Sequence, residues 1–85
     1  RTISINVFPN PTSDIISLEI YRESDSSELE VCLFNQLGEL FRKCAVERST
    51  LIEINISNLN KGVYFMQVTD TENGYFSKVQ KIIKI

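Results

Sequence analysis

The sequence predicts an all-β fold, and two observations lead to this prediction. Short runs of alternating or β-branched residues recur along the chain, and turn residues separate them at intervals of about ten residues. No stretch of about eleven residues keeps the period of an amphipathic helix. A chain of 85 residues can bury one modest core. We therefore expect a single domain in which two antiparallel sheets pack as a sandwich, with a small barrel as the alternative.

Composition and charge argue against nucleic acid and membrane as partners of this chain. Apolar residues make up 42% of the chain and charged residues 24%, which is an ordinary globular mixture. Nine basic residues against eleven acidic ones give a net charge of −2, which argues against nucleic acid as a partner. No apolar run approaches the ~20 residues that a membrane span needs, so we expect no membrane insertion. Because the chain opens directly on a strand pattern, we interpret it as a fragment of a longer protein, with any export signal upstream.

The first strand is expected over residues 3–7, where three β-branched residues alternate with polar ones. It must stop at Phe8-Pro9-Asn10-Pro11, because two prolines fix φ at two positions and remove two backbone donors. We expect a rigid corner there, outside either sheet. A second alternating strand follows over residues 16–21, and a charged, serine-rich loop is expected over residues 22–28.

The third and fourth strands, residues 29–34 and 40–46, flank the turn Asn35-Gln36-Leu37-Gly38. Asparagine at its first position and glycine at its fourth suit a type I turn with a left-handed glycine, so the strands should form a hairpin. Cys32 should then face Phe41 or Arg42, which leaves Cys44 two or three positions out of register. We expect two unpaired, partly buried thiols, with a disulfide as the alternative in an oxidising compartment.

The fifth strand, residues 52–56, alternates most regularly, and its three isoleucines are expected in the core. Next, Leu59-Asn60-Lys61-Gly62-Val63-Tyr64 leads into a sixth strand that runs to residue 68 with its even-numbered residues on one face. The spacing from Leu59 to Tyr64 resembles the tyrosine corner of immunoglobulin-like sandwiches, in which a buried hydroxyl bonds back to the chain upstream. The sequence therefore predicts an immunoglobulin-like antiparallel β-sandwich of about seven strands.

The seventh strand, residues 75–85, follows a polar turn that ends in Gly74 and should pair with the sixth strand as a hairpin. Lys78, Lys81 and Lys84 recur there at every third residue. Because lysine is a common protector of sheet edges, we favour a solvated edge over a basic docking stripe for all three.

The residue inventory argues against an enzyme. The chain has no histidine, and so lacks the usual general base, the commonest metal ligand and a partner for a nucleophilic Cys32. Three widely separated glycines form no phosphate loop. We therefore assign no catalytic, cofactor-binding or metal-binding residue and expect no cofactor. An alternative function is a carbohydrate-binding or adhesive module that uses Tyr21, Tyr75 or Phe76, although edge packing is the commoner role of such rings.

Taken together, the corner, the hairpin turn and the Leu-x-x-Gly-x-Tyr segment resemble the C-terminal sorting domain of the type IX (Por) secretion system, type A. Members show a strand, Tyr-Pro-Asn-Pro, a hairpin with Asp-x-x-Gly, Leu-x-x-Gly-x-Tyr and a last strand with lysines. Phe8 replaces the commoner tyrosine and Asn35 the commoner aspartate, and both keep the physical role. The residues that carry the resemblance, for recognition or for the fold, are Phe8, Pro9, Asn10, Pro11, Asn35, Gly38, Leu59, Gly62, Tyr64, Lys78 and Lys81.

The resemblance covers nearly the whole chain and implies a bacterium of the Bacteroidetes group. It implies that residues 1–85 are the C-terminal module of a larger secreted protein and serve as a non-catalytic signal. The implied partners are the outer-membrane translocon, which reads the domain after export to the periplasm, and a cysteine-protease-type sortase, which removes it at or upstream of Arg1. The cargo would then reach the cell surface or the extracellular space, commonly joined to anionic lipopolysaccharide.

Overall fold

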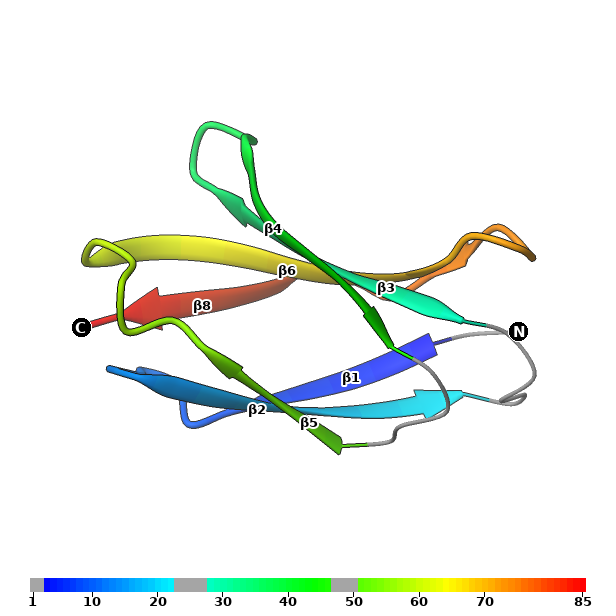
Figure 1. Ribbon diagram of the computed structural model, residues 1–85, viewed down its shortest axis with the longest axis horizontal. Coiled ribbons are helices and arrows are strands. Elements are labelled where there is room, and N and C mark those ends of the chain that lie inside the picture. The colour runs from blue at the N-terminus through cyan, green and yellow to red at the C-terminus, as the bar shows by residue number, and fades with distance from the viewer. Residues whose placement is uncertain (1–2, 23–27, 47–50) are drawn as a thin grey trace.

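A computed structural model of the chain describes residues 3–22, 28–46 and 51–85. Its strands are β1 (Ile3–Phe8), β2 (Ile15–Arg22), β3 (Leu29–Asn35), β4 (Leu40–Val46), β5 (Leu51–Asn55), β6 (Gly62–Asp70), β7 (Tyr75–Phe76) and β8 (Gln80–Lys84). They form two antiparallel sheets that face each other (Figure 1). Sheet A has the order β1-β2-β5; sheet B has the order β4-β3-β6, with β7 and β8 both paired to the far side of β6. The predicted sandwich is confirmed, and the small barrel is not formed.

Sheet A follows the alternation of the sequence closely. Ile16, Leu18 and Ile20 on the central strand β2 are at most 2% exposed, as the period of two predicts. On β5 and just beyond it, Ile54 and Ile56 are buried and Ile52 is half-buried against the core. Most of the loop expected over residues 22–28, and the link over residues 47–50, lie outside the described residues. No helix in the described ranges is long and apolar enough to cross a membrane.

The hairpin of β3 and β4 forms as expected, but its register differs from the prediction. A bulge between Leu33 and Phe34 shifts the pairing, so Cys32 lies opposite Lys43 instead of Phe41 or Arg42. Cys44 lies opposite Val31, one position from Cys32 and not two or three. Because neighbouring positions of a strand point to opposite faces, Cys44 packs against the core while Cys32 points outward. Both thiols are free.

The last predicted strand is broken into two short ones. β7 pairs Tyr75 with Asp70, but β8 pairs Gln80 with Met66, and this change of register accommodates one extra residue. Such a β-bulge reverses the faces of the residues that follow it. As a result, Tyr75 and Ser77 point inward before the bulge, and Gln80, Ile82 and Lys84 do so after it. The predicted partner strand is confirmed, whereas the predicted continuous hairpin is wrong.

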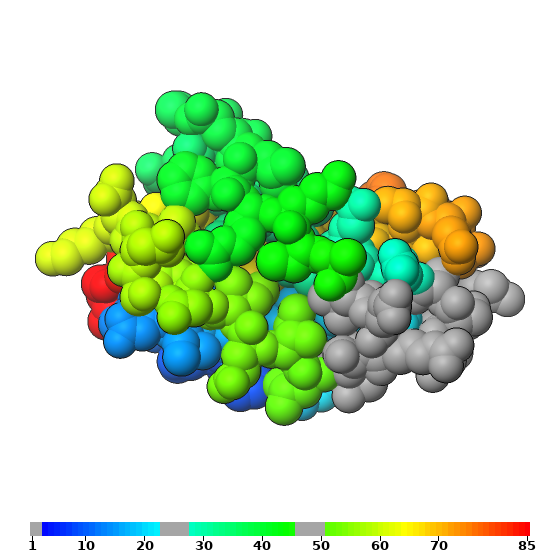
Figure 2. All heavy atoms as spheres, in the orientation of Figure 1, coloured from blue at the N-terminus to red at the C-terminus, as the bar shows by residue number. Residues whose placement is uncertain are grey.

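One hydrophobic core fills the space between the sheets. Sheet A with its adjoining link contributes Ile3, Val7, Ile16, Leu18, Ile20, Ile54 and Ile56, and sheet B contributes Leu29, Val31, Leu33, Tyr64, Met66, Val68 and Ile82. Figure 2 shows the hairpin of β3 and β4 projecting beyond the body of the domain. Arg42 on β4, an edge strand of sheet B, links the two sheets. Its guanidinium donates to the carbonyl of Asn55 on β5, an edge strand of sheet A, and to Oδ1 of Asn58.

Candidate functional site

The corner at Phe8-Pro9-Asn10-Pro11 lies against the outer edge of β8. Nδ2 of Asn10 donates to the carbonyl of Lys81 at 2.9 Å, and Oδ1 accepts from the backbone N–H of Ile83 at 3.0 Å. Thr12 continues this contact with its backbone, since its N–H donates to the Ile83 carbonyl at 2.9 Å and its carbonyl accepts from the Ile85 N–H at 2.8 Å. The corner is thus outside both sheets, as predicted, and is also fastened to the last strand.

The link from β5 to β6 forms a tyrosine corner, as the sequence predicts. The buried Tyr64 hydroxyl donates to the carbonyl of Asn60 at 2.8 Å, and its ring lies 5.8 Å from that of Phe41. Leu59 is half-buried and packs against the core. Gly62 has a φ of +152°, and no heavy atom lies within 4 Å of the place that a β-carbon would take. The backbone conformation, and not a lack of space, therefore selects glycine there.

The hairpin turn depends on the side chain of Asn35. Its Oδ1 accepts from the backbone N–H groups of Leu37 at 2.9 Å and Glu39 at 3.0 Å, which is the acceptor role expected of it. Nδ2 donates to Oε1 of Glu39 at 3.0 Å, a bond that an aspartate could not make. Gly38 has a φ of +82°, and its N–H donates to the Asn35 carbonyl at 3.1 Å. The predicted left-handed glycine is confirmed.

The register brings these motifs together at one end of the sandwich. Asn35 pairs with Tyr64 across β3 and β6, and Gly62 pairs with Lys84 across β6 and β8. Thr12 bridges to Lys84 from the other side. We call this surface the motif end; it comprises the corner with Thr12 (residues 8–12), the hairpin turn (35–38), the β5–β6 link (59–62) and residues 81–85. It is the end at which the C-terminus lies in Figure 1. A shallow hollow of about 180 Å³ separates the hairpin turn from the start of β6.

The three lysines of the last strand do not share one environment. Lys78 and Lys81 are exposed, and neither has an acidic partner among the residues that the structure describes. Lys84 is 8% exposed and its Nζ donates to the Ile85 carbonyl at 3.1 Å. The expectation of a solvated side chain is therefore wrong for Lys84, because the bulge in the last strand turns it inward.

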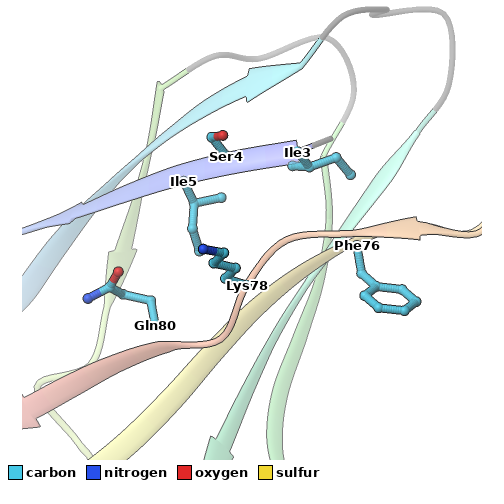
Figure 3. A pocket seen from close by; sticks show the side chains of 6 residues that line it. All are labelled: Ile3, Ser4, Ile5, Phe76, Lys78 and Gln80. Atoms are coloured by element: carbon cyan, nitrogen blue, oxygen red, sulfur yellow. The ribbon is translucent and has the colours of Figure 1, made fainter. Parts of the chain in front are cut away.

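A groove of about 370 Å³ lies between β1 and the segment that joins β7 to β8. Ile3 and Ile5 line it from β1, and Phe76, Lys78 and Gln80 line it from the other side, with Lys78 extending toward Ile5 (Figure 3). Of the motif residues, Lys78 alone lines this groove, which is separate from the motif end.

Among the described residues, no cluster of reactive groups lies at these surfaces. Burial raises the pKa of the Cys32 thiol, and the nearby Glu30 carboxylate raises it further, which is the opposite of what a nucleophilic thiolate needs. Within residues 3–22, 28–46 and 51–85, no three His, Cys, Asp or Glu side chains lie close enough to hold a metal ion. Tyr21 and Phe76 are exposed on different sheets, while Tyr75 packs against the core, so the three rings form no common platform.

Besides Lys84, sequence reasoning missed the burial of three polar residues, Thr12, Asp70 and Ser77. Thr12 is 2% exposed and carries the backbone bridge to β8, and Ser77 is 2% exposed and fills the bulge. The Ser77 hydroxyl accepts from the Val68 N–H at 2.9 Å and donates to the Lys78 carbonyl at 3.0 Å. The sequence did contain a signal for the bulge. Counting every second residue forward from Tyr75 places odd-numbered residues inward, whereas counting back from Ile82 places even-numbered residues inward. The two patterns agree only if one extra residue lies between them.

These features define a β-sandwich module with most of its sequence motifs gathered at one end. The chain belongs to the family of secretion system C-terminal sorting domains, whose model matches residues 6–84. This confirms the resemblance to the sorting signals of type IX secretion. Membership places the chain among the domains of proteins exported to the cell surface or the extracellular space, and this family acts as a signal and not as a catalyst.

The chain is also similar to parts of two larger proteins. The chain is 33% identical over 70 residues to the ulvan lyase NLR42 of Nonlabens ulvanivorans, a match that covers 82% of this chain and 12% of the lyase. Its structure matches dimeric latent PorU from Porphyromonas gingivalis with a TM-score of 0.73, over 98% of this chain and 9% of PorU. At 20% identity the second likeness shows the fold alone. Both organisms belong to the Bacteroidetes, and the chain spans only a small part of either protein.

Proposed function

We propose that this domain is the signal by which the outer-membrane translocon of the type IX system selects a protein in the periplasm. In this proposal the sortase then cuts upstream of the first strand, and the cargo is delivered to the cell surface. The observation that carries the proposal is the gathering of the corner, the hairpin turn and the tyrosine corner at one end of a domain of this family. The small share of the lyase and of PorU that the chain spans supports a larger parent protein with residues 1–85 as its C-terminal module.

The structure changes how this proposal is best tested. Deleting Lys78 to Ile85 would strand a fused cargo in the periplasm, but it would also remove Ile82, which is fully buried in the core. Unfolding of the domain would then explain the loss as well as lost recognition would. Substitutions of exposed side chains at the motif end separate the two explanations.

The test is a cargo fused to this domain, with Lys61→Glu and Lys81→Glu introduced together. Both side chains are exposed, so the free energy of unfolding should change by no more than about 0.5 kcal/mol per site. We expect the cargo to accumulate in the periplasm with the domain still attached. Glu72→Lys, in the turn at the opposite end, is the control and should be delivered and cut normally. Normal delivery of the double variant and of the deletion alike would refute the proposal.

The alternative, a carbohydrate-binding module, gains no support from the placement of its candidate rings. Tyr75→Ala would disturb the core, so exposed Tyr21 and Phe76 are the better positions for a test. Binding of a polysaccharide that Phe76→Ala or Tyr21→Ala abolishes, with the fold intact, would favour that class over sorting.

A further inference from the structure

The contact between the corner and β8 has the hydrogen-bond pattern of a strand pair. Residues 81, 83 and 85 of the last strand direct backbone groups away from β6, and the corner meets four of these groups in succession. The Asn10 amide bonds the Lys81 carbonyl and the Ile83 N–H, and the Thr12 backbone bonds the Ile83 carbonyl and the Ile85 N–H. Thr12 and Lys84 form a parallel bridge.

The carboxamide of Asn10 stands in for the backbone N–H and C=O of one strand residue in this arrangement. A primary amide can offer an N–H donor and its C=O acceptor toward the same neighbouring strand, as the N–H and C=O of Thr12 do. The two prolines beside it have no N–H of their own to contribute, so the side chain supplies the donor that the backbone lacks at these positions. The corner therefore acts as a parallel strand only two units long, one from a side chain and one from the main chain.

Without this cover, β8 would be an open sheet edge. Of the strands in sheet B, β8 pairs with β6 alone. An edge with unpaired N–H and C=O groups is a template for pairing with another strand, and native proteins cover such edges. The exposed side chains of Lys81, Ile83 and Ile85 flank the covered groups, so they stay available while the backbone does not.

We propose that Asn10 is a positioning residue of the sorting signal. Together with Thr12 it forms an edge clamp that closes the outer edge of β8 to strand addition and fixes the exposed side chains of residues 81, 83 and 85 for the secretion machinery. The closed edge of β8 is independent of the function proposed above. The role of the fixed side chains in secretion rests on that function. It implies that the machinery reads the side chains of the last strand and not its backbone, and that Asn10 acts through β8 without touching the partner.

The first test measures amide hydrogen exchange by NMR in the 85-residue chain. In Asn10→Ala, exchange at the Ile83 N–H should rise by about tenfold or more, because that amide loses its only acceptor at the edge. Asn10→Asp keeps the acceptor and loses the donor, so Ile83 should stay largely protected. Asn6→Ala is the control, since the Asn6 side chain bonds only to Glu19 on the exposed face of sheet A. Amides of the β3–β6 pairing serve as the reference for global unfolding.

The second test measures surface delivery of a fused cargo with the same variants. We expect delivery to fall most in Asn10→Ala and least in Asn6→Ala, in the order of the Ile83 exchange rates. Lost delivery with unchanged Ile83 exchange would make Asn10 a contact residue and overturn the clamp. Faster exchange with unchanged delivery would overturn the positioning role. If even the natural domain delivers no cargo, the proposed function fails, while the exchange result still decides whether the clamp exists.

Discussion

At the scale of single residues, polar side chains bond to backbone groups at three places where strands end or break. Asn35 ties the hairpin turn, Tyr64 holds the β5–β6 link, and Ser77 fills the bulge of the last strand. A buried donor or acceptor that loses its partner costs about 1–3 kcal/mol. Substitutions of such residues should therefore cost more than those of exposed residues of the same type.

The tyrosine corner provides a direct comparison of this kind. Tyr64→Phe should lower the free energy of unfolding by about 1 kcal/mol, because the Asn60 carbonyl loses its bond while the ring contact with Phe41 remains. Tyr21→Phe is the matched control, since the Tyr21 hydroxyl is exposed and bonds only to Glu19. Urea denaturation followed by circular dichroism measures both. Equal effects of the two substitutions would contradict the assignment.

Hydrogen bonds between residues close in the sequence could be predicted, whereas bonds to distant residues could not. The Tyr64 and Asn35 bonds reach partners within four residues, so spacing alone predicted them. Asn10 bonds to Lys81 and Ile83, more than seventy positions away, and no local pattern shows that contact. Its prolines predicted a corner correctly, but not what the corner touches.

At the scale of elements, the break between β7 and β8 is the main departure from simple alternation. The Ser77 N–H donates to the Val68 carbonyl at 2.8 Å, and its hydroxyl accepts from the Val68 N–H, so one residue serves both groups of its neighbour. The Gln67 amide adds a bond to the Ser77 carbonyl at 3.0 Å. Ser77 thus bonds the bulge to β6 within sheet B, and the bulge decides which side chains of β8 face the solvent.

Ser77→Ala should destabilise the domain by about 1–3 kcal/mol, because the Val68 N–H loses its acceptor in a buried place. Ser57→Ala is the control, since Ser57 is exposed and bonds only to the nearby Asn55, and it should change stability by less than about 0.5 kcal/mol. Thermal and urea unfolding of both variants provide the measurement. A Ser77→Ala domain as stable as the control would mean that the bulge does not depend on the hydroxyl.

Strands were predictable as elements, whereas their registers were not. Alternation in residues 16–21 and 52–56 predicted which residues face the core, since burial on one face imposes a period of two. The cysteine register and the broken last strand depended on single bulges, which add one residue without changing composition. For the same reason the buried position of Lys84 was not foreseen.

At the scale of the whole molecule, one core holds both sheets, so the domain should unfold as a unit. Its buried residues come in similar numbers from sheet A and sheet B, and among the described residues they form one cluster between the two sheets. Small single domains of this kind usually unfold in one cooperative transition. A substitution that removes packing in one sheet should therefore destabilise the other sheet as well.

Leu18→Ala should lower the free energy of unfolding by about 2–5 kcal/mol, because Leu18 is fully buried on the central strand of sheet A. Ile15→Ala on the same strand should cost less than about 1 kcal/mol, since Ile15 is 46% exposed. Urea transitions followed by circular dichroism and by tyrosine fluorescence should coincide for both variants, because Tyr21 and Tyr64 lie in different sheets. Separate transitions would contradict a shared core.

The edge clamp also has a consequence for the order of folding. Asn10 and its partners on β8 are separated by 71 and 73 positions, which makes this one of the longest loop closures that the chain can form. Forming a contact of such high sequence separation costs the most chain entropy, so these contacts form slowly. A chain that emerges from an export channel amino end first can close the clamp only after residues 81–85 have cleared the exit. The clamp would therefore close only after residues 81–85 have been released, whereas the local contacts of the tyrosine corner and the hairpin turn could form earlier.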